Sequence, residues 1–288
     1  MIIALFYNTQ KDNSHNIANS IREYLEKRSI TVLGEDEDAL HIEAIKLSSV
    51  PENKVDFCIT IGGDGTILRL IHKYPNLSAP ILAINLGSLG FMADITIEQI
   101  FVSLDNLING SYEIESRLLI EGITSTNQYS YALNEIVIHR SGYPSLIDLS
   151  IHVDNKYLNT FSADGIILST PSGSTAYSLS AGGPILSLGL NGLVLTPICP
   201  HTISNRPIVL SAEHTITIEY IGKSAYVDVI YDGIPSFTIK SGDSVSIHRS
   251  KKVFRQVNMP THDYFATLRT KLGWSGQLKN SLNSKKIL

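Results

Sequence analysis

The sequence predicts two domains of different class: an α/β domain with an open, mostly parallel sheet over residues 1–116, and a β-rich, sandwich-like domain over residues 117–261. In the first part, apolar runs alternate with amphipathic helical patterns, which is typical of a parallel sheet. In the second part, short segments alternate polar and apolar residues with period two, as strands of a sandwich do. A helical pattern returns at 262–274, and we expect this last segment, 262–288, to pack on the α/β domain, because a lone amphipathic helix must bury its apolar face.

In the first region we expect strands at residues 2–7, 55–61 and 80–85, and helices that start near Asn13, Ile67 and Ile97. Asn13 or Ser14 would cap the first helix. Ligands of parallel sheets bind at the carboxyl ends of the strands. The loops that follow the second and third strands are therefore expected to share one crevice.

The second region reads as a series of short strands. We expect them at residues 117–123, 131–139, 147–153, 157–161, 165–169, 214–220, 226–231, 236–239 and 244–248. Asp154-Asn155-Lys156 has the residue types of a hairpin turn between two of them.

Composition argues against a nucleic-acid-binding, zinc-binding, secreted or membrane protein. The chain has 288 residues, 43% of them hydrophobic, and a net charge of −4, without the basic stripe that nucleic-acid binding requires. Its two cysteines form no zinc motif and suit a reducing compartment. The N-terminus lacks a basic signal region, and no apolar run approaches the about 18 residues of a membrane helix. We therefore expect a cytoplasmic protein with no nucleic-acid or membrane partner.

Residues 62–66, GGDGT, follow an apolar strand and precede a helical pattern. A helix N-terminus after a glycine turn receives phosphate, because backbone N–H groups converge there and the helix dipole favours an anion. The carboxylate of Asp64 would repel a phosphate unless it binds Mg²⁺ or takes a proton from an attacking hydroxyl. The motif therefore indicates phosphoryl transfer, with an ordinary glycine turn as the alternative. Its spacing matches neither GxGxxG nor the Walker pattern.

A second cluster, at residues 164–184, is rich in serine and threonine and on its own favours a polar loop with a helix cap. Four motifs occur in order: GGDGT at 62, LGSLGF at 86, Asn134-Glu135, and STPSGSTAYSLSAGGP at 169. With this combination, residues 55–275 resemble the NAD kinase family, which phosphorylates the 2′-hydroxyl of the adenosine ribose of NAD to give NADP. GGDGT alone is shared with 6-phosphofructokinases and with diacylglycerol and sphingosine kinases, whereas GSTAY with Asn-Glu is more specific.

The resemblance implies roles for single residues around the glycine loop. Asp64 matches the base that activates the ribose hydroxyl. The backbone that holds the phosphates matches Gly62, Gly63, Gly65 and Thr66. The resemblance implies no metal-ligating residue in this chain.

Further roles concern the dinucleotide. Phe91 would lie near the adenine, Asn134 at the adenine edge and Glu135 at the ribose hydroxyls, and Asp164 would contact the nicotinamide end, often across a subunit boundary. The segment that would line the adenosine and phosphate pocket contains Ser172, Thr175, Ala176, Tyr177 and Ser180.

The resemblance also implies NAD and ATP as partners, Mg²⁺ or another divalent cation with the donor, and a homodimer or homotetramer. Where many members carry a basic residue after the first strand, this chain has Asn8 or Thr9, so the donor-phosphate contact stays unassigned. Asp232-Gly233 resembles a family element, but is as well explained as a plain hairpin turn. A lipid or sugar kinase that shares GGDGT, and a non-catalytic NAD-binding sensor, remain alternatives.

Overall fold

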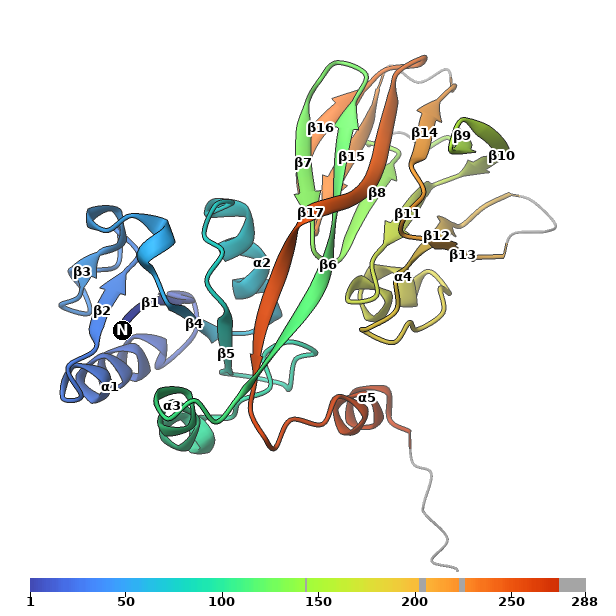
Figure 1. Cartoon of the computed structure of the whole chain (residues 1–288). Helices are drawn as coiled ribbons and strands as arrows, with labels where there is room; N and C mark the ends of the chain where they lie inside the picture. The colour runs from blue at the N-terminus through green and yellow to red at the C-terminus, as the bar shows by residue number, and fades with distance from the viewer. Residues whose placement is uncertain (143, 202–205, 223–225, 275–288) are drawn as a thin grey trace, which may run out of the picture. The chain divides into compact units, whose positions relative to one another are not determined.

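The computed structural model describes residues 1–142, 144–201, 206–222 and 226–274, and it divides the chain into two compact units (Figure 1). The first unit contains Met1–Ile67, Ile81–Glu113 and the described residues from Val257. The second contains Leu68–Pro80 and Ile114–Gln256. The part of the predicted last segment at 275–288 lies outside the described residues. Among the described residues, no helix has the length and apolar character needed to cross a membrane.

The first unit contains five neighbouring strands whose pairs are all parallel, in agreement with the mostly parallel sheet that the sequence predicted. Its strands lie in the order β5 (Ile81–Asn85), β4 (Phe57–Gly62), β1 (Ile2–Tyr7), β2 (Thr31–Gly34) and β3 (Ile45–Lys46). The order runs outward in both directions from β1 and β4, so the topological switch lies between these two strands. Ligands of such sheets bind beside the carboxyl ends at the switch, which is where β4 meets the GGDGT loop.

Helices cover this sheet through apolar stripes. Ile17, Ile21 and Leu25 of α1 (Ser14–Glu26) and Leu104 of α3 (Ile100–Ile108) share one core cluster with β1, β4 and β5. The 3₁₀ turn η3 (Ile97–Gln99) enters α3 with a complete capping box. The helices predicted near Asn13 and Ile97 are thereby confirmed.

The expected side-chain cap of α1 is wrong. Asn13 stands at the N-cap position with φ 63°, and its side chain caps no backbone N–H. Instead, its Oδ1 accepts a hydrogen bond from the Asn16 side chain. At the other end of the chain, α5 (Tyr264–Leu272) is capped by the Asp263 carboxylate, which accepts from the Ala266 N–H, and ends at the left-handed Gly273.

The second unit is a sandwich of antiparallel sheets, as predicted. One sheet contains β10-β9-β14-β17, with β6 joined to β17 and β7, and the other has the order β13-β12-β11-β8-β15-β16. The two inner faces share one core that includes Ile120, Ile151, Leu168 and Val229. The strands are β6 (Glu113–Thr124), β7 (Tyr129–Ala132), β8 (Glu135–His139), β9 (Ile147–Val153), β10 (Lys156–Ala163), β11 (Gly165–Ser169), β12 (Gly192–Ile198), β13 (Ile208–Ser211), β14 (Ile216–Tyr220), β15 (Val227–Tyr231), β16 (Ile234–Ile239) and β17 (Ser244–Asn258).

Three strand predictions need correction. The single strand expected at 131–139 is broken at Leu133-Asn134, because the N–H groups of residues 133–135 donate to the Asp232 carboxylate. Strand β17 runs ten residues beyond its expected end at 248. Strands β2, β3, β12 and β13 were not predicted.

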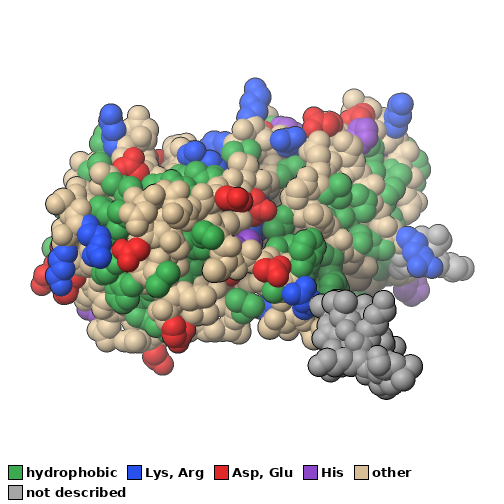
Figure 2. Space-filling model, turned by 60° about the horizontal axis from the view of Figure 1, so that its bottom comes forward, with side chains coloured by type: hydrophobic (Ala, Val, Ile, Leu, Met, Phe, Trp, Pro, Cys, Tyr) green, Lys and Arg blue, Asp and Glu red, His purple; other side chains and the backbone are tan. Residues whose placement is uncertain are grey.

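The Asp154-Asn155 hairpin turn is confirmed. Both residues have positive φ, 48° and 65°, and the ladder of β9 and β10 closes directly beside them. On the face drawn in Figure 2, Lys and Arg side chains are interspersed with Asp and Glu. This mixed surface agrees with the small net charge.

Candidate active site

The glycine loop follows β4 in the first unit and leads into α2 (Asp64–Lys73). A Cβ at Gly62 would overlap the Thr66 hydroxyl, so local packing requires glycine there. A Cβ at Gly63 or Gly65 would meet no atom within 4 Å outside its own helix backbone, and neither residue has a left-handed φ. Packing and backbone strain therefore do not explain these two glycines. What they provide is open space in front of the backbone at a helix N-terminus.

Three loops meet at the carboxyl edge of the parallel sheet. The Asn8 N–H donates to the Ile61 carbonyl at 2.9 Å, and the Leu86 N–H donates to the Gly62 carbonyl at 2.8 Å. These bonds hold the loops after β1 and β5 against the glycine loop. Backbone contacts thus bring together the loops that the sequence expected to share a crevice.

Lys11 supplies a cation at this edge. Its Nζ lies 3.8 Å from the position that a Cβ of Gly87 would take. The Nζ makes no hydrogen bond or ion pair with the described residues, and the side chain is exposed. Sequence reasoning looked for a basic residue at Asn8 or Thr9 and overlooked this lysine, which lies two residues after Thr9.

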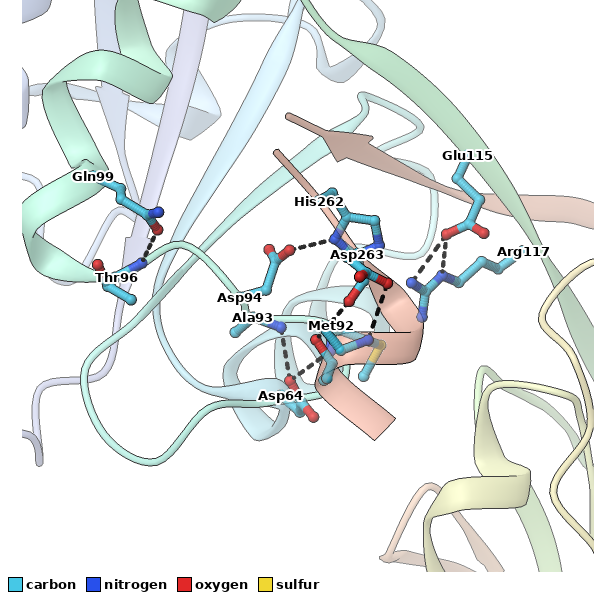
Figure 3. Close-up of polar contacts among 12 residues, drawn as sticks. Asp64, Met92, Ala93, Asp94, Thr96, Gln99, Glu115, Arg117, His262 and Asp263 are labelled. Carbon is cyan, nitrogen blue, oxygen red and sulfur yellow. Dashed lines mark hydrogen bonds and ion pairs between the residues drawn. The ribbon is translucent and has the colours of Figure 1, made fainter. Parts of the chain in front are cut away.

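The Asp64 carboxylate is held by the loop that follows β5. It accepts hydrogen bonds from the backbone N–H groups of Phe91, Met92 and Ala93 at 2.9, 3.1 and 2.9 Å. Figure 3 shows Met92 and Ala93 beside the carboxylate. A Cβ at Gly90 would overlap this carboxylate, so the glycine lets the loop wrap around it. Oδ1 takes two of the bonds and Oδ2 only one, which leaves Oδ2 with a free acceptor position.

The same loop is fixed from its other side by the C-terminal segment. Asp94 pairs with His262 Nδ1, and Figure 3 shows the two side chains turned toward each other. The Nζ of Lys271, on α5, lies 5.4 Å from the centre of the Phe91 ring, within the range of a cation–π contact. The final helix therefore covers Phe91, a residue that the sequence placed near the adenine.

Asn134 and Glu135 lie in the second unit, where β8 begins. They are 8% and 6% exposed. The Asn134 amide makes no side-chain hydrogen bond with the described residues, and Glu135 Oε2 has no partner. Buried polar groups are normally satisfied. Here two adjacent side chains instead keep hydrogen-bonding groups that have no partner among the described residues.

Burial raises the pKa of Glu135 to about 8, with the neighbouring Asp232 carboxylate adding to the rise and a hydrogen bond from the Tyr177 backbone opposing it. Asp232 accepts the backbone N–H groups of Leu133, Asn134 and Glu135. The plain-turn explanation of Asp232 therefore misses what its side chain does. The only indication in the sequence that Asp232 has a role was the Asp-Gly pair at a predicted hairpin.

The serine- and threonine-rich cluster divides into two groups. Four hydroxyl residues are completely buried and bonded within the chain; these are Ser169, Thr170, Ser174 and Ser178. The hydroxyls of Ser172 and Ser180 make no hydrogen bond with the described residues. Thr175 donates to the Ser172 carbonyl at 3.0 Å.

Tyr177 and Ser180 line a cavity of about 440 Å³ in the second unit, together with Cys199 and several prolines. Ala176 stands between η4 (Gly173–Thr175) and α4 (Tyr177–Ser180). Asp164 pairs with Arg140 at 2.7 Å. The predicted dinucleotide residues other than Phe91 thus gather in the second unit, whereas Phe91 and the phosphate-loop residues gather in the first.

Comparison with known families decides between the alternatives. The model of the ATP-NAD kinase N-terminal domain matches residues 3–112, and that of the ATP-NAD kinase C-terminal domain matches residues 133–259. The chain belongs to the NAD kinase family. It is therefore a phosphotransferase that converts NAD to NADP, as the resemblance implied.

The sequences of individual relatives align with this chain over nearly their whole length. The NAD kinase of Protochlamydia amoebophila is 54% identical over 96% of this chain and 100% of its own, and that of Geotalea daltonii is 39% identical over 94% and 98%. An NAD kinase from Archaeoglobus fulgidus, solved in complex with ATP, aligns with a TM-score of 0.76 and 28% identity over 96% of this chain and 100% of that one. Yeast NADH kinase complexed with NADH shares the fold, with a TM-score of 0.86 and 24% identity over 98% and 89%.

The glycine loop yields a first prediction. Gly63→Ala and Gly65→Ala should leave the thermal unfolding midpoint near the wild-type value, yet raise the KM for ATP by about tenfold or more, because a methyl group enters the space that a phosphate needs. Gly62→Ala should instead lower stability by about 1–3 kcal/mol through overpacking against Thr66. Equal effects of all three variants on both quantities would contradict this division.

A second prediction concerns the pH dependence of stability. The folded-state pKa of Glu135, about 8, lies above its ordinary value of 4.5. The stabilisation that the protonated Glu135 contributes to the free energy of unfolding is therefore fully present below pH 4.5 and is lost as the pH rises through 8. Glu135→Gln should remove this loss, because glutamine does not titrate. As the pH rises from 4.5 to 8, the free energy of unfolding of the wild type should fall increasingly below that of the variant. Urea titrations at stepped pH measure it.

Glu213→Gln is the matched control for that series. The pKa of the exposed Glu213 is lowered by Asn191 and Arg249, so this group finishes titrating below its ordinary value. The difference in unfolding free energy between Glu213→Gln and wild type should therefore stay constant above pH 4.5. Parallel stability curves for wild type and Glu135→Gln would show that Glu135 carries no raised pKa.

Proposed function

We propose that Asp64 is the general base of this NAD kinase and takes the proton from the ribose 2′-hydroxyl. The observation that carries the proposal is its carboxylate, fixed by three N–H donors at a helix start while Oδ2 keeps one acceptor position. A positioned base typically contributes about 10²–10⁴-fold to such a reaction. Fixing the loop and the carboxylate together limits the reorganisation needed when the hydroxyl arrives.

The donor is proposed to bind at the glycine loop. The open space at Gly63 and Gly65 suits the phosphates of ATP, with Gly62 and Thr66 as the packed base of the loop. The unpaired ammonium of Lys11 supplies the positive charge that the sequence left unassigned. The ATP complex of the archaeal relative supports ATP as the donor.

A divalent cation, Mg²⁺ in our proposal, accompanies the donor. Mg²⁺ usually takes one or two protein carboxylates and completes its shell with water and substrate phosphates. The described residues contain no group of three or more His, Cys, Asp or Glu side chains that could hold a metal ion. In our proposal the cation arrives on the donor phosphates, where it would neutralise phosphoryl charge.

NAD is proposed to bind through the two unsatisfied side chains of the second unit. The Asn134 amide offers both donor and acceptor to an adenine edge. Glu135 Oε2 is free to bond the ribose hydroxyls, and a site built this way rejects analogues that lack them. Around this pair, the proposed pocket wall is formed by Ser172, Thr175, Ala176, Tyr177 and Ser180.

Three finer assignments remain proposals. Phe91 would pack near the adenine, and Asp164 would contact the nicotinamide end. A homodimer or homotetramer would be the working assembly. Both cysteines, Cys58 and Cys199, are free thiols, which supports a reducing compartment such as the cytoplasm.

The base assignment is tested by Asp64→Asn. The amide oxygen can still accept from Met92 and Ala93, so the loop should stay in place while kcat falls by about 10²–10⁴-fold and NAD affinity is largely kept. Asp94→Asn, in the same loop, should reduce kcat far less. A turnover of Asp64→Asn within about threefold of wild type would exclude Asp64 as the base.

Substrate scope is tested by a phosphorylation assay with NAD, NADH, diacylglycerol and sphingosine as acceptors and with ATP and polyphosphate as donors. We expect NADP from NAD and ATP, and no lipid product, because Asn134 and Glu135 suit a nucleoside. In the same assay Glu135→Ala should weaken NAD affinity more than ATP affinity. A sizing column run alongside reports the assembly.

A further inference from the structure

Asp232 does more than its turn requires. It is the first residue of the hairpin turn between β15 and β16, with φ 51° beside Gly233 at φ 78°. Such turns accept Asn-Gly as readily as Asp-Gly, because the backbone conformation is what matters. Yet the Asp232 side chain is 0% exposed. A buried carboxylate is costly unless it is well bonded, so its presence needs another explanation.

Four donors converge on this carboxylate. The backbone N–H groups of Leu133, Asn134 and Glu135 donate to it at 2.9, 2.7 and 3.2 Å, and His72 Nε2 lies 2.9 Å from Oδ2. In return, the Asp232 N–H donates to the Glu135 carbonyl at 3.0 Å. Three successive N–H groups that face one anion form a nest. The backbone beneath Asn134 and Glu135 is therefore tied to Asp232.

His72 is itself held in position. Its ring lies parallel to that of Tyr131, with 5.5 Å between centroids and 6° between planes. The Tyr131 hydroxyl donates to the carbonyl of Ile71, the neighbour of His72 on α2. The stacking restricts rotation of the imidazole, so its Nε2 stays directed at the carboxylate.

The opposite side of the same backbone is also clamped. The Thr170 N–H donates to the Asn134 carbonyl at 2.8 Å, and a Cβ at Gly173 would overlap that carbonyl. With both sides of the strand break fixed, the directions in which the Asn134 and Glu135 side chains leave the backbone are set before any ligand arrives. Such preorganisation reduces the entropy lost on binding.

We propose that Asp232 and His72 form a positioning pair for NAD: they aim Asn134 and Glu135 at the adenosine without touching it. The inference rests on the proposed dinucleotide role of Asn134 and Glu135. It predicts that loss of the pair weakens NAD binding and leaves ATP binding and the chemical step nearly unchanged.

The test compares four variants of the full chain. Asp232→Asn keeps the turn and removes the charge; His72→Phe keeps the stacked ring and removes the donor; His72→Gln keeps a donor. Asp154→Asn is the matched control, because Asp154 also stands at a hairpin turn with positive φ and pairs with a histidine, His214, but on the exposed surface. NAD binding by calorimetry, KM for both substrates, kcat and thermal midpoints are measured for each.

Asp232→Asn should weaken NAD binding about tenfold or more, with kcat and the KM for ATP within about threefold of wild type, because a charge-assisted bond and part of the nest are lost. His72→Phe should weaken NAD binding by about fivefold or more, and His72→Gln should recover most of it. Asp154→Asn should stay within about twofold of wild type.

Equal losses for NAD and ATP, or a lower thermal midpoint with unchanged NAD binding, would overturn the positioning role and leave a structural one. If Asp232→Asn does not fold, the two His72 variants decide: His72→Phe with wild-type NAD binding would overturn the proposal. Asn134→Ala separates this failure from that of the proposed function. Unchanged NAD binding in Asn134→Ala would remove the dinucleotide site itself, whatever Asp232 does.

Discussion

An aspartate carboxylate that accepts hydrogen bonds from three consecutive backbone N–H groups is the interaction on which the candidate residues of each unit depend. Asp64 collects those of residues 91–93 in the first unit, and Asp232 collects those of residues 133–135 in the second. In each case one buried or half-buried charge replaces several ladder or water contacts, and an irregular stretch of backbone becomes fixed. Charge-assisted bonds of this kind are short and strong.

Glycines make these arrangements possible. The loop can wrap around Asp64 only because Gly90 carries no side chain, and the strand break at Asn134 is approached by Gly173 in the same way. Gly63 and Gly65 have a different purpose, since no part of the described chain occupies the space beside them. Glycines that look alike in the motif therefore divide into those that packing requires and those that face open space.

The two units differ in which of their polar side chains lack a partner among the described residues. In the first, the Asp64 carboxylate accepts three backbone N–H groups and keeps one acceptor position at Oδ2, and the ammonium of Lys11 pairs with none of the described residues, so a cation lies at the edge of the sheet. In the second, Asp232 is satisfied and Asn134 and Glu135 are not, so open hydrogen-bonding groups stand where a nucleoside would bind. Burial, with the neighbouring Asp232 carboxylate adding to the effect, raises the pKa of Glu135.

The sequence by itself determined the class of each unit and the family, because hydrophobic periodicity reports which elements form, and GGDGT, Asn134-Glu135 and GSTAY are local strings. Only the tertiary structure decided that Asp232 is more than a turn residue, that His72 faces it, that Lys11 stands beside Gly87, and that four hydroxyls of the serine-rich cluster serve the fold. The physical reason is separation along the chain. Asp232 meets Asn134 across 98 residues and His72 across 160, and no local pattern encodes a hydrogen bond between groups so far apart.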